Sequence, residues 1–199
     1  MSSRLVDGQT YSLDEYRQLY LGHLSSLGLY PTRRLTQQKF DDIYKNVPRV
    51  GVDSVIVSPD NKSVLLVRRD IPPVYQTGAW HLPGGGIRKY ELLDDAVKRK
   101  AKEEVGLDVK VERLIGVYGD PLNDVMFWTR TEGWQVVHDP EILAIRHSIA
   151  ITYLARERGG TLRGSPEGRE LRFFSFDALP DRIGFHHKRV LDDCRNQLT

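Results

Sequence analysis

Three consecutive glycines at positions 84–86 stand just before a charged stretch with helical character, from about residue 91 to 105. Glycine adopts backbone conformations that other residues avoid, and it lets the backbone come close to a ligand. The first amides of a helix have no partners within the helix, so this junction favours a bound phosphate or a nearby cation. Gly106 follows the stretch and is typical of a helix C-terminus. The sequence therefore predicts a ligand-binding loop that enters a helix.

Hydrophobic periodicity along the rest of the chain predicts alternating strands and helices. Apolar and β-branched runs indicate strands near 50–57, 64–67, 109–117, 148–154 and 171–176, and helical spacing indicates a closing helix near 186–196. This alternation favours an α/β or α+β class. The segment 118–146 lacks such a pattern, and a connection of this length is typical of a functional loop.

Two helices are predicted before the first of these strands. Ser12 and Glu15 have the spacing of a capping box, and a second helix is expected between about residues 36 and 47. We therefore divide the chain into a helical N-terminal extension, residues 1–48, and one main domain, residues 49–199.

Composition excludes several classes of protein. The 199 residues include 29 Lys and Arg against 27 Asp and Glu, a formal net charge of +2, which disfavours a nucleic-acid partner. Cys194 is the single cysteine, which excludes an intrachain disulfide and fits a reducing cytoplasm. The first ten residues lack an apolar core, and Asp53 interrupts the apolar run 50–57, so neither a signal peptide nor a membrane span is expected.

Two adjacent carboxylates, Glu103 and Glu104, lie near the end of the helix that follows the glycines. Arg99 is four residues before Glu103 and can orient this pair. Mg²⁺ prefers oxygen ligands and is usually held by few carboxylates together with water and substrate phosphates. The sequence therefore predicts a half-site for a diphosphate-bound Mg²⁺ or Mn²⁺ ion.

The whole segment resembles the signature of the Nudix hydrolases, Gly-x5-Glu-x7-Arg-Glu-apolar-x-Glu-Glu-x-Gly-apolar. The matching residues are Gly85, Glu91, Arg99, Ala101, Glu103, Glu104, Gly106 and Leu107. The resemblance covers the chain from about residue 49 to its end. It implies a Nudix-type α/β/α sandwich with a mixed sheet. It also implies a pyrophosphohydrolase that acts on phosphoric anhydrides, cleaving a nucleoside diphosphate linked to another moiety.

The resemblance also implies a role for each matching residue. The predicted metal ligands are Gly85, through its carbonyl, Glu103 and Glu104. The predicted catalytic set within the signature contains Arg99 and Glu103, with a salt bridge from Glu91 to Arg99 that positions the carboxylates. The predicted structural supports of the site are Glu91, Gly84 and Gly106.

One residue departs from the signature, because Lys100 stands where the family has the first Glu after Arg. Its ammonium group would share a helix face with Glu103 and Glu104 and compete with a cation there. The attacking water then needs a base from outside the signature. We assign this role to His138, whose ordinary pKa is nearest neutrality. The other candidates in the same loop are Asp120, Asp124, Glu132, Asp139 and Glu141.

Substrate contacts are predicted outside the signature. Trp128 and Trp134 are candidates for stacking on a nucleobase, or else for covering the loop, and Arg69 is a candidate for a phosphate contact. The segment 116–121 and the strand near 147–156 resemble sugar-nucleotide hydrolases. ADP-ribose or a GDP-sugar is therefore the first substrate to test.

Three other functions stay open at this point. Lys100 could neutralise the site, so that the domain binds a nucleotide as a sensor without turnover. Tyr16 and Tyr20 could form a docking stripe for a partner or a homodimer contact, although such a stripe is also typical of a core. RNA-end processing is disfavoured by the nearly balanced charge.

Overall fold

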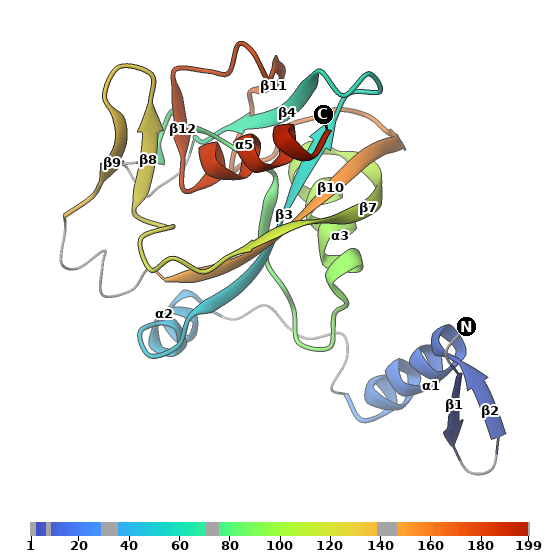
Figure 1. Cartoon of the computed structure of the whole chain (residues 1–199). Helices are drawn as coiled ribbons and strands as arrows, with labels where there is room; N and C mark the ends of the chain where they lie inside the picture. The colour runs from blue at the N-terminus through green and yellow to red at the C-terminus, as the bar shows by residue number, and fades with distance from the viewer. Residues whose placement is uncertain (1–2, 7–8, 29–35, 71–75, 139–146, 199) are drawn as a thin grey trace.

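The structure is a computed structural model of the whole chain, and it describes all residues except 1–2, 7–8, 29–35, 71–75, 139–146 and 199 (Figure 1). A ten-stranded mixed sheet forms its centre, with strands in the order β7-β10-β3-β4-β5-β12-β8-β9, while β11 pairs with β4 and β6 pairs with β3. The predicted α/β class with a mixed sheet is confirmed.

The strands of this sheet come from both halves of the main domain. They are β3 (Arg49–Val57), β4 (Ser63–Arg68), β5 (Trp80–His81), β6 (Gly84–Gly86), β7 (Leu107–Tyr118), β8 (Met126–Thr129), β9 (Gly133–Val136), β10 (Ser148–Gly160), β11 (Leu171–Ser175) and β12 (Arg182–Gly184). The central pair β3–β10 is parallel, and β10 is antiparallel to β7 on its other side. The long connection between β7 and β10 is thus not wholly a loop, because it contains the antiparallel hairpin β8–β9.

Two helices cover opposite faces of the sheet, and each has its own apolar cluster. Helix α3 (Leu93–Val105) buries Ala96, Val97, Ala101 and Val105 on one face, and α5 (His187–Leu198) buries Val190, Leu191 and Cys194 on the other. Successive side chains of a strand point to opposite faces. Accordingly, Val55 of β3 joins the α5 cluster and Ile56 joins the α3 cluster. This arrangement is the predicted α/β/α sandwich.

The N-terminal segment contains a two-stranded antiparallel hairpin, β1 (Ser3–Val6) and β2 (Gln9–Ser12), which the sequence did not predict. Helix α1 (Leu13–Ser26) follows directly, and its predicted capping box is present, with Ser12 and Glu15 bonded in both directions. Helix α2 (Gln37–Tyr44) precedes β3. The division between residues 48 and 49 stays a prediction. No helix in the described part of the chain is both long and apolar enough to cross a membrane.

Candidate functional site

The glycine loop lies against the central strand of the sheet. Gly86, Gly85 and Gly84 of β6 pair with residues 51–53 of β3. A Cβ atom added at Gly84 would lie 2.0 Å from Asp53 Oδ1, and one added at Gly85 would lie 2.7 Å from Lys100 Cε, where φ is also 150°. Only glycine allows side chains from β3 and α3 to come this close to the loop.

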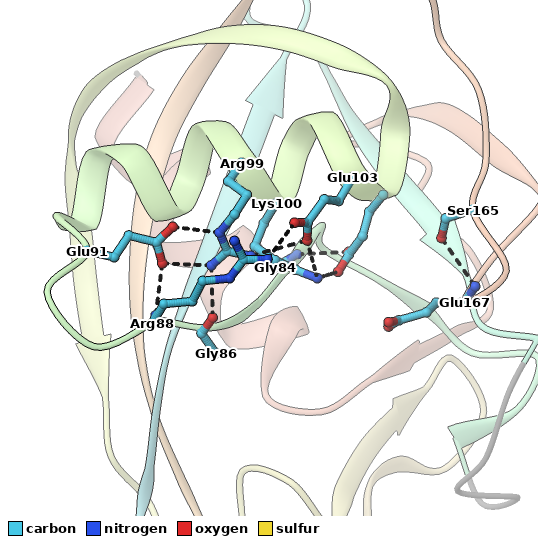
Figure 2. Close-up of polar contacts among 10 residues, drawn as sticks. Gly84, Gly86, Arg88, Glu91, Arg99, Lys100, Glu103, Ser165 and Glu167 are labelled. Atoms are coloured by element: carbon cyan, nitrogen blue, oxygen red, sulfur yellow. Dashed lines mark hydrogen bonds and ion pairs between the residues drawn. The ribbon is translucent and has the colours of Figure 1, made fainter. Parts of the chain in front are cut away.

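Arg99 of α3 connects the start of its helix to the glycine loop. Its guanidinium donates two hydrogen bonds to Glu91, at 2.5 and 2.7 Å, and a third to the carbonyl of Gly86 at 3.1 Å (Figure 2). Burial raises the pKa of Glu91, but the hydrogen bonds from Arg99 and Arg88 outweigh burial and leave this pKa below its ordinary value. The structure therefore contains the predicted Glu91–Arg99 pair, as a bidentate contact.

The two candidate metal ligands lie in different environments. Glu103 is exposed and accepts hydrogen bonds from Arg99 at 3.1 Å and from Arg88 at 3.2 Å. Glu104 is buried, with 4% of its surface exposed, and accepts a bond of 3.1 Å from the amide of Gly84. Burial raises the pKa of Glu104, while the neighbouring Lys100 opposes this rise.

The ammonium of Lys100 occupies the position that a cation bound to both carboxylates would need. Its Nζ forms an ion pair with Glu104 and lies 3.7 Å from Glu103 Oε2. We call the six side chains of this network the charged box; they are Arg88, Glu91, Arg99, Lys100, Glu103 and Glu104. Its three carboxylates and three cationic groups balance in charge. Carboxylate oxygens are ligands that a divalent ion prefers, but such an ion must displace the ammonium of Lys100.

One pocket connects the charged box with other parts of the chain. It is lined by the glycine loop and Glu104, by the start of α5, and by residues of β3, β10 and α2. Its aromatic and charged lining includes Phe40, Tyr44, Arg49, Asp53, Arg69, His81, Asp124, His147, Glu167, Phe185, His186 and His187. Segments far apart in the sequence therefore meet around the glycine loop.

Asp53 lies opposite Gly84 and faces two histidines at the start of α5. Its Oδ2 is 3.4 Å from Nε2 of His187 and 3.9 Å from Nε2 of His186. We call these three residues the histidine–aspartate cluster. Burial raises the pKa of Asp53, but the histidines, led by His187, outweigh burial and leave this pKa lowered. Burial lowers the pKa of His186 to about 3, so this ring is neutral at neutral pH.

Comparison with known proteins identifies the family. The NUDIX domain matches residues 47–194. The chain belongs to the Nudix family. It is 33% identical over 146 residues to an ADP-ribose pyrophosphatase of Methanocaldococcus jannaschii, covering 73% of this chain and 72% of that protein. It is 41% identical over 88 residues to the low-salt glycan biosynthesis protein Agl8 of Haloferax volcanii, covering 44% of this chain and 54% of Agl8.

A solved structure supports the same assignment. An ADP-ribose pyrophosphatase from Streptococcus suis aligns with a TM-score of 0.54 and 25% identity, over 76% of this chain and 92% of that one. Nudix hydrolases generally use divalent metals. Membership of this family, with relatives named ADP-ribose pyrophosphatases, supports pyrophosphohydrolase activity for the chain.

Within the Nudix domain, the pocket includes some of the substrate and base candidates and not others. Arg69 and Asp124 line it. His138 is exposed and is not among the lining residues, and Trp128 and Trp134 face each other across the β8–β9 hairpin, also outside the lining. The roles assigned to these three residues thus have no support from the pocket. Asp139 and Glu141 lie outside the described residues.

Several residues of the pocket are not predicted from the sequence. In the sequence Asp53 only interrupts an apolar run, although a lone carboxylate within a buried strand is itself a sign of function. His186 and His187 fall within the predicted last helix, and no motif surrounds Glu167. Glu167 lies near enough to Glu104 for its negative charge to raise the pKa of Glu104 further.

Proposed function

We propose that this Nudix protein hydrolyses the diphosphate of a nucleoside diphosphate linked to another moiety, with ADP-ribose or a GDP-sugar as the first substrates to test. The observation that carries this proposal is the pocket that joins Gly84, Gly85 and Glu104 to an aromatic pair on α2. A phosphate-binding loop next to an aromatic surface fits a nucleotide better than it fits inorganic pyrophosphate. Family membership and the named relatives support the same substrate class.

The proposed cation is Mg²⁺ or Mn²⁺, held by Glu103, Glu104 and the carbonyl of Gly85. When bound, such an ion would neutralise diphosphate charge and orient water for attack on phosphorus. Lys100 would leave Glu104 and pair with a phosphate oxygen instead. The Glu91–Arg99 pair would hold the helix against the glycine loop, because Arg99 contacts both Glu91 and the Gly86 carbonyl.

The nucleobase is proposed to stack on Phe40 and Tyr44. Their ring centroids are 4.5 Å apart, and the guanidinium of Arg49 lies 5.5 Å from the Phe40 ring centroid. The Nε atom of Arg49 is also only 3.1 Å from the point where a Cβ of Gly86 would lie. Arg49 is therefore placed between the aromatic pair and the glycine loop, as a phosphate contact requires.

For the base, the pocket favours two carboxylates over the exposed His138. Asp124 lines the pocket and accepts a hydrogen bond of 2.7 Å from Ser148, and Glu167 faces Glu104. Either could accept a proton from water bound near the diphosphate. Loss of activity in Asp124→Asn or Glu167→Gln, with activity retained in His138→Gln, would support this choice.

The experiment that tests the function is phosphate-product release from a panel of nucleoside triphosphates, nucleoside diphosphate sugars, ADP-ribose and dinucleotides. Each is assayed with Mg²⁺, Mn²⁺ or EDTA, on the natural chain and on Lys100→Glu. Turnover of one class that EDTA abolishes supports the proposal and names the substrate. Turnover only in Lys100→Glu, or in neither protein, overturns it.

A second candidate function is a nucleotide sensor on the same fold, and the ion pair between Lys100 and buried Glu104 favours it. In that case Lys100 permanently replaces a cation. Tight binding of ADP-ribose without a metal, combined with no turnover, would support the sensor, and metal-dependent turnover would exclude it.

A further inference from the structure

We propose that the histidine–aspartate cluster, Asp53 with His186 and His187, is a binding site for a divalent transition-metal ion, separate from the carboxylates of the charged box. It opens on the same pocket. The proposal concerns metal binding alone, so it does not depend on which substrate the enzyme takes.

The geometry of the cluster fits a metal centre. One oxygen of Asp53 and one ring nitrogen from each histidine all lie within 4.8 Å of one another. Ligand atoms about 2.1 Å from a tetrahedral ion are about 3.4 Å apart. The two distances from Asp53 Oδ2, 3.4 Å to His187 and 3.9 Å to His186, therefore need little contraction around an ion.

The fold holds the three side chains in place before any ion binds. Asp53 has the same parity along β3 as Val55, so its side chain points to the sheet face that α5 covers. His187 is the first residue of α5 and His186 precedes it. The ring of His186 stacks on Tyr118 with centroids 5.3 Å apart. A preformed arrangement of this kind lowers the cost of ordering the ligands.

His186 has buried polar atoms that nothing else in the described part of the chain satisfies. Neither of its ring nitrogens has a hydrogen-bond partner there, although only 4% of the residue is exposed. Leaving a buried polar group unpaired destabilises the folded protein. A metal ion that accepts the lone pair of Nε2 would satisfy one of these atoms.

The atom types of the cluster indicate the kind of ion. Asp53 offers a carboxylate oxygen and each histidine offers a ring nitrogen, and Nε2 of His186 has no hydrogen-bond partner among the described residues. Two imidazole nitrogens and one carboxylate oxygen suit Zn²⁺, Co²⁺, Fe²⁺ or Mn²⁺. Mg²⁺ prefers oxygen ligands and fits the charged box better.

His187 should be the weakest of the three ligands. The amide of Leu82 donates a hydrogen bond of 3.0 Å to its Nδ1, which leaves the ring proton on Nε2, facing Asp53. To bind an ion through Nε2, the ring must move this proton to Nδ1 and give up the bond from Leu82. His186 has no such bond to lose. The proposal therefore predicts unequal contributions from the two histidines.

Cobalt provides the test, because Co²⁺ bound by nitrogen and oxygen ligands absorbs visible light. The metal-free full-length chain is titrated with Co²⁺, in parallel with Asp53→Asn, His186→Gln and His187→Gln. Glu103→Gln and Glu104→Gln serve as controls in the charged box, and circular dichroism checks that each variant folds. We expect one ion per natural chain, and affinity losses of roughly 100-fold or more for Asp53→Asn and His186→Gln. Removal of a direct ligand should exceed the 10- to 100-fold loss typical of residues that only hydrogen-bond to a ligand.

The expected result includes a smaller loss for His187→Gln and an unchanged cobalt spectrum in both controls. Absence of a cobalt spectrum in the natural chain would overturn the proposal. So would a spectrum that survives Asp53→Asn and His186→Gln but disappears in Glu103→Gln or Glu104→Gln, which would assign the ion to the charged box. If a cluster variant fails to fold, Zn²⁺ is titrated against bound Co²⁺ in His187→Gln and in the two box controls. Weaker metal binding in His187→Gln alone assigns the ion to the cluster, and weaker binding in the box controls alone assigns it to the charged box.

Discussion

The histidine–aspartate cluster and Glu104 of the charged box line one pocket, but the two regions satisfy their polar groups in opposite ways. In the charged box every carboxylate already has cationic partners: Glu91 and Glu103 bind arginines, and Glu104 pairs with Lys100. In the cluster, Asp53 faces two histidines, and the ring nitrogens of His186 have no partner among the described residues. A cation must therefore displace the ammonium of Lys100 in the box, whereas in the cluster it displaces no charged side chain and costs only the bond from Leu82 to His187.

This difference indicates how each region should respond to change. Burial makes His186 of the cluster, and His81 near it, resist protonation, so these two histidines should control how stability varies near pH 6. The box depends on a balance of fixed charges, so single charge changes should alter its cation binding and its catalysis.

Acid should destabilise the metal-free protein mainly through its buried histidines. Burial lowers the pKa of His81 and of His186 to about 3, against an ordinary value of 6.5. The unfolded chain thus binds more protons in this interval, so stability is complete above pH 6.5 and is lost as pH falls towards 3. By pH 5 the loss is about 2 kcal/mol for each histidine, or about 4 kcal/mol together. Urea unfolding in EDTA at pH 7 and pH 5 measures it.

The matched variants for this measurement are His186→Gln, which should halve the loss, and the exposed His138→Gln, which should leave it unchanged. Glu104 acts in the opposite direction, because burial raises its pKa and its contribution is lost as pH rises. Repeating the urea unfolding at both pH values in Glu104→Gln removes this opposing contribution. Equal urea midpoints at both pH values would mean that water or a proton already satisfies the buried rings.

Glu104→Gln should reduce the rate of hydrolysis by about 100-fold or more. A bound cation contributes several kcal/mol of charge stabilisation in the transition state, and Gln provides no charge to hold it. Steady-state kinetics with Mg²⁺ on the best substrate of the panel measures the effect, and the exposed Glu132→Gln is the control. If Glu104→Gln keeps its rate of hydrolysis while Asp53→Asn loses it, the cluster and not the charged box holds the cation that catalysis needs.

Removing the charge of Lys100 should make the box easier to occupy. In Lys100→Gln the Mg²⁺ concentration for half-maximal rate should fall about tenfold, since relief of roughly 1.4 kcal/mol of repulsion corresponds to that factor. Lys102→Gln, on the same helix and paired with Asp108, is the matched control. A higher Mg²⁺ requirement in Lys100→Gln would instead show that Lys100 binds the substrate and not merely the carboxylates.

The same contrast explains what could be predicted from the sequence. The charged box lies mostly on one helix, so fixed spacing from Glu91 to Gly106 placed its residues, and Lys100 contacts both carboxylates as expected. The core strands and α5 were predicted because apolar runs reveal burial. The hairpin β8–β9 was missed because its strands have four residues each and are only partly buried.

The cluster could not be derived in this way, because its members come from β3 and from the start of α5. Only the packing of α5 on the sheet brings residues 53 and 186 together. The same holds for Phe40, which reaches the pocket from α2, in a segment assigned to an extension outside the main domain. These residues reach the pocket through tertiary contacts, so no local sequence pattern predicts them.

The smallest predicted effect tests which aromatic residues bind the nucleobase. Stacking of a base on an aromatic ring contributes about 1–3 kcal/mol. Tyr44→Leu should therefore raise KM about fivefold or more with little change in kcat, because the ring binds the substrate away from the scissile bond. Tyr44 is preferred to Phe40 for this test because the Phe40 ring also contacts Arg49.

Trp134→Leu on β9 is the matched control, since Trp134 is an exposed aromatic outside the pocket. Its KM should equal that of the natural chain. A diphosphate substrate without a nucleobase should show the same KM in Tyr44→Leu and in the natural chain, because no base is present to stack. The opposite pattern, a raised KM in Trp134→Leu alone, would show that the nucleobase stacks on the β8–β9 hairpin. It would then leave the aromatic pair of α2 outside the binding site.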